Sequence, residues 1–377
     1  MRLFFIIALA IYLAPNFYVL LRVRSLFCNP LHKTIFAAIY ALLALNFPIS
    51  EPLAHFHGGR LVRIFAIIAY YTLPWLLYLF LFLLLFELTL GANRIFKFIE
   101  TATLQSHRFR LVSLCALFIL PALAMAAGII NYHIIRVRKY QIEIPRRAST
   151  LSQLRIVFAA DFHLRDITTR RFMQTFVEKV NAQNPDIVLI PGDILEGDRH
   201  KSREDEFAAQ FRRIKSKYGV FASLGNHEFY GAKAGSDFFV HSGIRVLEDE
   251  FVNVADAFYC AGRLDQHYPH RKPLDDLMRG IPKNLPLIML DHRPKDMLET
   301  SRADVDIQVM GHTHNGQLFP LNYIVRCVYP LNWGYRKINN THFFVTSGIQ
   351  TWGPPVKTSS NNEIVVIDVK LIEESYK

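Results

Sequence analysis

A long apolar run, residues 61–90, constrains this chain more than any other feature. Its centre, Trp75 to Phe86, holds only apolar and aromatic residues. About 20 consecutive apolar residues are enough for a helix to cross the hydrocarbon core of a bilayer. A helix that is apolar on every side must be buried in a large core or in lipid. The sequence therefore predicts a transmembrane helix here.

Three further apolar stretches, residues 3–21, 34–50 and 111–135, bring the predicted total to about four spans. A signal peptide is the alternative for the first stretch, but no small-residue cleavage site follows it and more apolar segments do. We therefore predict an all-α membrane anchor domain over residues 1–140. A transporter or receptor is a further hypothesis, but the spans hold few ionisable residues, chiefly Glu87, which favours an anchor.

The charge is distributed as unevenly as the apolar residues. Residues 150–377 carry 28 basic and 28 acidic side chains, so 15 of the chain's 43 basic residues and 4 of its 32 acidic residues lie in the first 149. The basic excess thus flanks the predicted spans, which argues against a nucleic-acid partner and for a membrane one. Basic residues are split almost equally between the two sides, so they do not set the orientation.

Four scattered cysteines, Cys28, Cys115, Cys260 and Cys327, form no disulfide framework and no CxxC metal motif. Reduced thiols fit a cytosolic face. We therefore expect a multi-pass protein of the cell membrane whose soluble domain lies on the cytoplasmic side.

The rest of the chain has the pattern of a soluble α/β domain. Residues 141–152 are polar and include Pro145, and we predict a linker there, followed by a catalytic domain over residues 153–377. Short apolar runs alternate with segments of helical spacing, such as residues 168–181. The runs predicted as strands are residues 154–160, 186–190, 220–224, 287–290, 305–309, 343–345 and 364–370.

Polar residues follow these predicted strands one after another. His312 and His314 alone could be two solvated histidines in a polar turn. The same design recurs at four other strand ends, however, and in α/β sheets ligands bind at the carboxyl ends of the strands. The full set is Asp161, His163, Asp193, Asn226, His292, His312 and His314. One metal ion would not use seven donors, whereas two divalent ions that share a bridging carboxylate would. The mixed oxygen and nitrogen donors suit Mn, Fe or Zn better than Mg.

This set resembles the calcineurin-like metallophosphoesterases. The resemblance rests on Asp161-x-His163, Gly192-Asp193, Gly225-Asn226-His227-Glu228, His292 and Gly311-His312-Thr313-His314, in the family's order. It implies a four-layer α-β-β-α sandwich. It also implies that Asp161, His163 and His314 hold one metal, that Asn226, His292 and His312 hold the second, and that Asp193 bridges them. Hydrolysis in the family proceeds by attack of a hydroxide that bridges the two metals.

Two further residues take catalytic roles through the resemblance. His227 resembles the family histidine that stabilises the transition state or protonates the leaving group. In many relatives an Asp orients that histidine, but Glu196 stands at the matching position and is one methylene longer. Arg165, Arg293 and Asn315 adjoin predicted ligands and are candidate substrate-binding residues. Each arginine could equally be solvated or paired locally.

The substrate is predicted from the architecture rather than from a motif. Residues 318–333 are unusually apolar for a surface insertion, and they either pack in the core or form a wall for acyl chains or membrane beside the metals. The connection after Ile135 is short, which keeps the catalytic domain near the bilayer. The short connection favours a lipid-linked phosphodiester or pyrophosphate, and within the family the chain resembles the UDP-diacylglucosamine pyrophosphatases. The alternatives are a non-enzymatic binding module and a phosphodiesterase of soluble nucleotides. The sequence does not set the oligomeric state.

Overall fold

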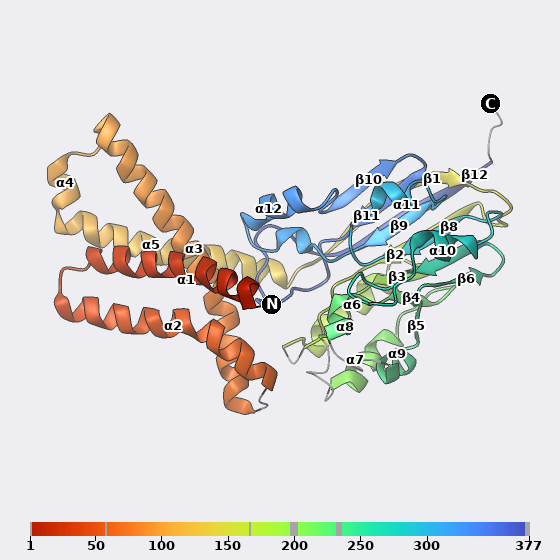
Figure 1. Ribbon diagram of the computed structural model, residues 1–377, viewed down its shortest axis with the longest axis horizontal. Helices are drawn as coiled ribbons and strands as arrows, with labels where there is room; N and C mark the ends of the chain where they lie inside the picture. The colour runs from red at the N-terminus through yellow and green to blue at the C-terminus, as the bar shows by residue number, and fades with distance from the viewer. Residues whose placement is uncertain (1, 57–58, 166, 197–202, 231–235, 374–377) are drawn as a thin grey trace. The chain divides into compact units, whose positions relative to one another are not determined.

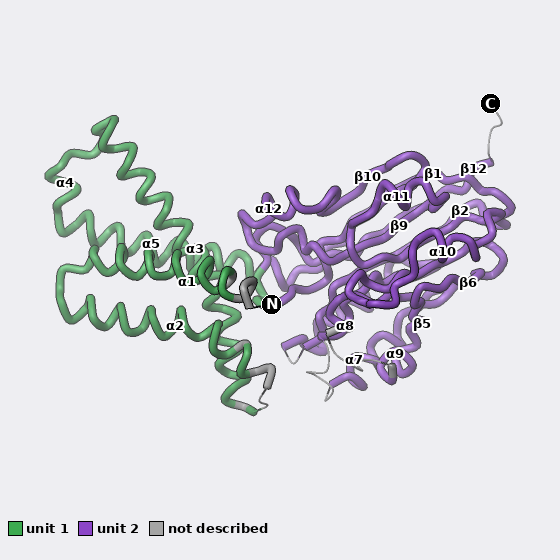
Figure 2. The backbone as a smooth tube through the Cα atoms, viewed as in Figure 1, with its two compact units in different colours: residues 1–130, 353–356 green, residues 131–352, 357–377 purple. Residues whose placement is uncertain are grey.

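The computed structural model describes residues 2–56, 59–165, 167–196, 203–230 and 236–373 (Figure 1). The chain divides into two compact units (Figure 2). The first contains residues 1–130 and 353–356, and the second contains residues 131–352 and 357–377.

The first unit is all-helical. Its helices are α1 (Arg2–Leu26), α2 (Pro30–Phe56), α3 (Arg60–Phe96), α4 (Thr101–Gln105) and α5 (His107–Tyr132). Three segments of the described chain are long and apolar enough to cross a membrane, namely Pro30–Ser50, Leu61–Phe96 and His107–Tyr132. These match the second, third and fourth predicted spans. The first predicted span, residues 3–21, lies within α1 and is not among these three.

Among the described residues, the helices of this unit pack through apolar side chains and an ion pair. Val19, Leu79 and Leu83 are completely buried in their shared cluster. Glu87 of α3 accepts a hydrogen bond from Arg22 Nε of α1 at 2.9 Å. The pair gives the acidic residue of the third span a structural partner, because a charge inside an apolar bundle is retained only when it is paired.

The second unit consists of two six-stranded sheets. The first has the order β1-β12-β2-β3-β4-β5 and the second β10-β11-β9-β8-β7-β6. In each sheet four neighbouring strands are parallel, namely β2 to β5 in the first and β7, β8, β9 and β11 in the second. The strands are β1 (Ile135–Pro145), β2 (Gln153–Phe158), β3 (Ile187–Pro191), β4 (Val220–Ser223), β5 (Ile244–Val246), β6 (Glu250–Val254), β7 (Phe258–Gly262), β8 (Leu287–Leu290), β9 (Ile307–Met310), β10 (Gly334–Ile338), β11 (Thr341–Val345) and β12 (Asn362–Ile372).

Helices cover the outer face of each sheet, while a shared core lies between the sheets. Phe158 of β2 and Phe344 of β11, both fully buried, meet edge to face in that core. The α-helices described in this unit are α6 (Arg170–Asn181), α7 (Glu204–Phe211), α8 (Asn226–Tyr230), α9 (Ser236–Ser242), α10 (Leu274–Arg279), α11 (Met297–Thr300) and α12 (Leu321–Val328). Helices α6, α7 and α9 pack on the first sheet, and α10 and α11 pack on the second. The predicted four-layer α-β-β-α sandwich is thus confirmed.

Helix α6 shows how the sequence pattern builds a covering layer. The Thr169 side chain caps its first turn by accepting a hydrogen bond from the Phe172 amide. Met173, Phe176 and Val180 recur at helical spacing and are completely buried against the first sheet. The helix lies within the predicted range 168–181.

The structure differs from the prediction around residues 131–152. The fourth span was expected to reach residue 135 and a linker to fill 141–152, but α5 ends at Tyr132 and residues 135–145 form strand β1. β1 pairs in parallel with β12 and buries Ile142 and Ile144 on one face. Those two residues alternate with polar ones, which is the pattern of a half-buried strand. Gln141 and Glu143, whose polarity suggested a linker, are exposed on the other face of this edge strand.

Candidate active site

The seven candidate ligands all follow the carboxyl ends of parallel strands. Four come from the first sheet, after β2, β3 and β4, and three from the second, after β8 and β9. The two sheets face each other, so these ends meet at one edge of the sandwich. Hydrogen bonds join the two sides there: His292 Nδ1 lies 2.9 Å from the Pro191 carbonyl oxygen, and the His312 amide donates to both carboxylate oxygens of Asp161 at 3.0 and 3.1 Å.

The first group of side chains is Asp161, His163 and His314. One ligand atom from each lies within 4.8 Å of the others, and all three residues are buried. His163 Nε2 and His314 Nε2 are 3.0 Å apart, and His314 Nε2 is 3.7 Å from Asp161 Oδ1. These atoms converge on a space of the size of one cation.

The second group is Asp193, His292 and His312, which meet the same 4.8 Å condition. Asp193 Oδ2 is 3.0 Å from His292 Nε2 and 3.9 Å from His163 Nε2. This carboxylate therefore lies between the two groups. Because His292 Nδ1 faces the Pro191 carbonyl, the tautomer with its proton on Nδ1 leaves Nε2 as the donor atom.

The residues fit a pair of divalent cations. The Asn226 side-chain oxygen is buried and makes no hydrogen bond, which is costly unless another electropositive group meets it. Burial raises the pKa of Asp161 to about 7, so a cation beside this carboxylate would offset the cost of its charge. Burial also holds the pKa of His312 and of His314 well below the usual value, and neutral imidazole is the form that binds metals.

Five of the seven candidate ligands have left-handed backbone conformations. Their φ angles are 59° for Asp161, 42° for His163, 54° for Asp193, 73° for His312 and 48° for His314. Such angles are uncommon for residues with a Cβ and cost on the order of 1–3 kcal/mol each. This concentration of strain is typical of a functional site, because sharp turns aim consecutive side chains at one point.

Two glycines make room for the carboxylates. A Cβ on Gly225 would overlap the side chain of Asp193, and a Cβ on Gly311 would stand 2.5 Å from Asp161 Oδ2. Neither position can hold a side chain without displacing a candidate ligand. The glycines in the Gly-Asn-His-Glu and Gly-His-x-His motifs are therefore part of the site.

Glu228 holds two of the ligand-bearing turns in place. Its carboxylate is 3% exposed and accepts four backbone amide hydrogen bonds. Oε1 accepts from Ile194 at 2.6 Å and Leu195 at 2.9 Å, while Oε2 accepts from Asp193 at 3.1 Å and Gly225 at 2.8 Å. The motif around Glu228 does not reveal this role, because three of its four partners are backbone amides of a turn 33 to 35 residues away in the chain.

Glu196 contacts two histidines at once. Oε2 lies 2.8 Å from His227 Nδ1, and Oε1 lies 3.0 Å from Nδ1 of the candidate ligand His163. Burial by itself would lower the pKa of His227, but the carboxylates of Asp193 and Glu196 outweigh it and raise that pKa to about 9. Glutamate at this position thus fixes the orientation of His227 and of His163 together.

Tyr329 is a site residue that the sequence analysis missed. Its hydroxyl lies 2.9 Å from His312 Nε2, while His312 Nδ1 faces His292 Nε2 at 3.2 Å. A hydrogen bond to the far ring nitrogen sets the tautomer and orientation of a histidine ligand. Tyr329 directly follows α12, in the apolar segment 318–333.

The three predicted substrate-binding residues all have partners within the protein. Arg165 is buried and donates to the Thr351 carbonyl at 2.8 Å. Arg293 donates to Asp265 at 2.7 Å, and Asn315 accepts from Asn332 at 2.6 Å. These contacts support the shape of the site, and a direct role in substrate binding stays a prediction.

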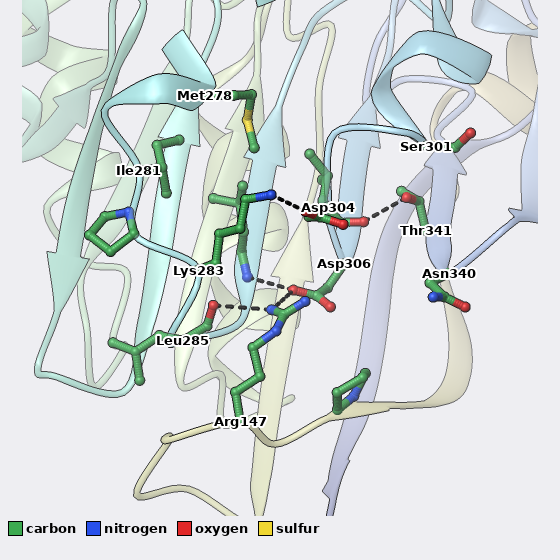
Figure 3. A pocket seen from close by; sticks show the side chains of 14 residues that line it. Arg147, Met278, Ile281, Lys283, Leu285, Ser301, Asp304, Asp306, Asn340 and Thr341 are labelled. Atoms are coloured by element: carbon green, nitrogen blue, oxygen red, sulfur yellow. Dashed lines mark hydrogen bonds and ion pairs between the residues drawn. The ribbon is translucent and has the colours of Figure 1, made fainter. Parts of the chain in front are cut away.

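A cavity of about 410 Å³ lies elsewhere in the second unit (Figure 3). Its lining includes Leu287 and Thr341, the first residues of β8 and β11, so it opens at the strand ends opposite to the candidate ligands. Its charges are paired, with Arg147 2.5 Å from Asp306 and Lys283 2.5 Å from Asp304 (Figure 3). The cavity is thus separate from the candidate active site.

Comparisons with known proteins agree with the geometry. The model of the calcineurin-like phosphoesterase family matches residues 154–316. An uncharacterized metallophosphoesterase of Campylobacter jejuni is 30% identical over 270 residues, which are 69% of this chain and 70% of that protein. A transmembrane protein with a metallophosphoesterase domain from Danio rerio is 32% identical over 61% of this chain. This chain spans 56% of its length.

Similar solved structures include a purple acid phosphatase from yellow lupin seeds. It is 16% identical, with a TM-score of 0.35, over 60% of this chain and 55% of that one.

Proposed function

Because this chain belongs to the metallophosphoesterase family, we propose that it is a membrane-anchored hydrolase of a phosphodiester or pyrophosphate bond. The observation that carries the proposal is the position of Asp193, whose carboxylate lies 3.0 Å from His292 of one group and 3.9 Å from His163 of the other. A carboxylate between two sets of donors is what a pair of metal ions requires.

We assign the ligands on this geometry. Asp161, His163 and His314 would hold one divalent ion, and His292 and His312 would hold the other, with Asp193 shared by both. The family resemblance puts Asn226 with the second ion, and its buried side-chain oxygen without a hydrogen-bond partner supports that role. When bound, such a pair activates a water molecule and neutralises the charge that develops on the phosphoryl oxygens. Mn, Fe and Zn suit the donors.

The protein's own residues supply the proton. Glu196 fixes His227 through Nδ1, so the imidazolium form is stabilised and the opposite ring nitrogen carries a proton for the leaving-group oxygen. The His227 amide also donates to Asp193 Oδ1 at 2.9 Å, which fixes His227 to the carboxylate that lies between the two groups of candidate ligands. This linkage keeps the proton donor at a set distance from the reacting phosphate.

We also propose that the substrate is lipid-linked. The candidate spans of the same chain support this, since an anchored enzyme meets substrates in the bilayer at high local concentration. A panel of UDP-diacylglucosamine, phospholipids, polyprenyl phosphates and cyclic nucleotides would test it. If the protein hydrolysed only the cyclic nucleotides, the proposed lipid-linked substrate would be wrong and the substrate would be a soluble nucleotide.

The catalytic assignment is tested with the full chain in detergent. We expect hydrolysis of bis(p-nitrophenyl) phosphate only with added divalent metal, and loss of both metal ions and activity in Asp193→Asn. Metal content is measured alongside the rate, so that a bound but inactive form is recognised. Full activity of Asp193→Asn would refute the assignment, and a metal-free, inactive wild type would favour a binding module.

A further inference from the structure

Helix α12 presents an apolar face to the outside of the second unit. Tyr323, Ile324 and Val328 are 56%, 61% and 61% exposed, and no residue of the helix is buried. Phe319, just before the helix, is 49% exposed, and its ring lies 6.0 Å from that of Tyr323. Tyr323, Ile324, Cys327 and Val328 lie on one side of a helix, because they are spaced by one, three and four residues.

Helix α6 shows that an amphipathic helix of this domain can bury its apolar side. α6 is also amphipathic, yet it buries Met173, Phe176, Val177 and Val180 against its sheet. In α12 the apolar side is turned outward instead. A monomeric soluble domain rarely exposes a contiguous apolar patch of this kind unless something covers it.

Trp352 extends the same apolar surface. Its side chain is 54% exposed, and its carbonyl oxygen accepts a hydrogen bond from Gln317 at 3.1 Å, two residues before Phe319. Tryptophan and tyrosine are enriched where a protein meets the lipid headgroups. We call Phe319, Tyr323, Ile324, Val328 and Trp352 the α12 patch.

The charge around the patch complements an anionic lipid surface. No Asp or Glu occurs in the sequence between Asp306 and Glu363, whereas Arg326 of α12 is basic and exposed. Anionic headgroups attract basic residues that lie near the surface of a bilayer. A water-soluble protein partner would not explain both an acid-free stretch and aromatic residues at its border.

The end of a candidate span is fixed to the segment that carries Trp352. Tyr132, the last residue of α5, donates to Gln350 at 3.0 Å, and Asn131 donates to the carbonyls of Lys357 and Ser360 at 2.9 and 2.7 Å. These contacts lie within the second unit. They hold Gln350, Lys357 and Ser360 beside Tyr132, the residue at which the last candidate span, His107–Tyr132, ends. The bilayer is therefore the surface that the chain itself brings near.

We propose that the α12 patch inserts into the headgroup region of the bilayer and that the catalytic site works at the membrane surface. The link to the site is Tyr329, which follows Val328 and reaches His312 at 2.9 Å. A headgroup phosphate at the site and lipid at the patch would then lie on either side of Tyr329. The proposal rests on the proposed function only for this last step, since the membrane contact is measured without turnover.

The experiment places a nitroxide on Cys327, which is a native exposed residue of α12. The full chain carries Cys28→Ser and Cys115→Ala, which leaves Cys260 as the other cysteine, and that residue is buried. The protein is reconstituted in nanodiscs of phosphatidylglycerol and phosphatidylcholine. Collision of the label with oxygen and with a water-soluble nickel chelate is measured by electron paramagnetic resonance. The control label replaces Val240, an apolar residue of α9 that is 78% exposed, in a background that also carries Cys327→Ser.

We expect strong collision with oxygen and weak collision with nickel at Cys327, and the reverse at Val240→Cys. In the presence of Ile324→Asp and Val328→Asp the nickel collision rate at Cys327 should rise at least tenfold. Hydrolysis of soluble bis(p-nitrophenyl) phosphate should stay unchanged, which shows that the fold is intact.

Strong nickel collision in the wild type would mean that the patch faces water and would overturn the proposal. Weak collision with both reagents would mean that protein covers the patch, and would overturn it too. A wild type with no hydrolysis but a lipid-exposed label would leave the proposal standing and refute only the proposed function.

Discussion

Substituting Glu228 by glutamine tests whether this buried carboxylate builds the site. The two side chains have the same shape, but glutamine has one acceptor oxygen and presents an NH₂ group in place of the other. Either orientation of the amide sets that NH₂ against two backbone N–H donors, either those of Ile194 and Leu195 or those of Asp193 and Gly225. Two hydrogen bonds to a charged acceptor are therefore lost whichever way the amide points.

The magnitude follows from the number of bonds. Each hydrogen bond to a charged group contributes about 1.5–3 kcal/mol. Losing two should lower the local free energy of opening by roughly 3–6 kcal/mol, which corresponds to amide exchange faster by on the order of 10²- to 10⁴-fold. The change should be confined to the turns after β3 and β4, and the affinity for metal should fall with it because Asp193 and Asn226 lie on those turns.

Hydrogen exchange of the full chain, followed by mass spectrometry of peptides that cover 191–196 and 223–228, measures this effect. Glu178→Gln, at an exposed position of α6, is the matched control and should leave exchange in both peptides unchanged. Exchange rates within threefold of wild type in Glu228→Gln, together with unchanged metal content, would show that the four amides do not depend on the carboxylate. The account of how the two turns are held would then be wrong.

Three further variants test the groups around the ligands. Tyr329→Phe should lower the affinity for metal about tenfold or more, because it removes a hydrogen bond to a candidate histidine ligand. The control, Tyr323→Phe on the exposed side of α12, should leave that affinity unchanged. Equal metal affinity of the two variants in a chelator competition would contradict the role given to Tyr329. In Glu196→Asp the aspartate side chain is too short to contact both His163 and His227. The kcat for a soluble phosphodiester should therefore fall about 100-fold, with a smaller change in KM. An unchanged kcat would show that contact with one histidine is enough. Gly225→Ala places a Cβ against the carboxylate between the two groups, and elemental analysis should find fewer than two metal ions per chain; full occupancy would mean that the turn can shift at little cost.

The ligand set could be predicted because it depends on a local pattern. Each donor lies within a few residues of a buried strand, and apolar runs identify such strands from sequence alone. His292, for example, lies two residues after the apolar run 287–290, and the observed β8 has the predicted bounds. The meeting of the two sheets at one edge was supplied by the family resemblance, since strand pairing over long separations is not readable from one sequence.

Other features depend on contacts that no local pattern reveals. Tyr329 reaches His312 only because residues 316–328 turn back over the site, and a tyrosine in an apolar segment reads as a core residue. β1 was missed for a different reason. Its charged residues outnumber Ile142 and Ile144, so the apolar alternation is hard to recognise. An edge strand tolerates such charged side chains because much of its surface is exposed to solvent. Two alternating apolar residues before Pro145 were the signal that could have revealed it.

The strained turns indicate that the fold, rather than the metal, sets the geometry of the site. Five left-handed residues at about 1–3 kcal/mol each cost on the order of 5–15 kcal/mol, which is comparable with the whole stability of a typical domain. Ligands free to relax would not keep such angles. They keep them because each turn continues directly from a strand whose side chains are buried in the core between the two sheets. Backbone hydrogen bonds, such as the one from the Gly311 amide to the His292 carbonyl at 3.0 Å, also fix one turn to the next. A site held in this way loses little conformational entropy when cations bind. The free energy needed to order the ligands is therefore supplied by folding and not by each binding event.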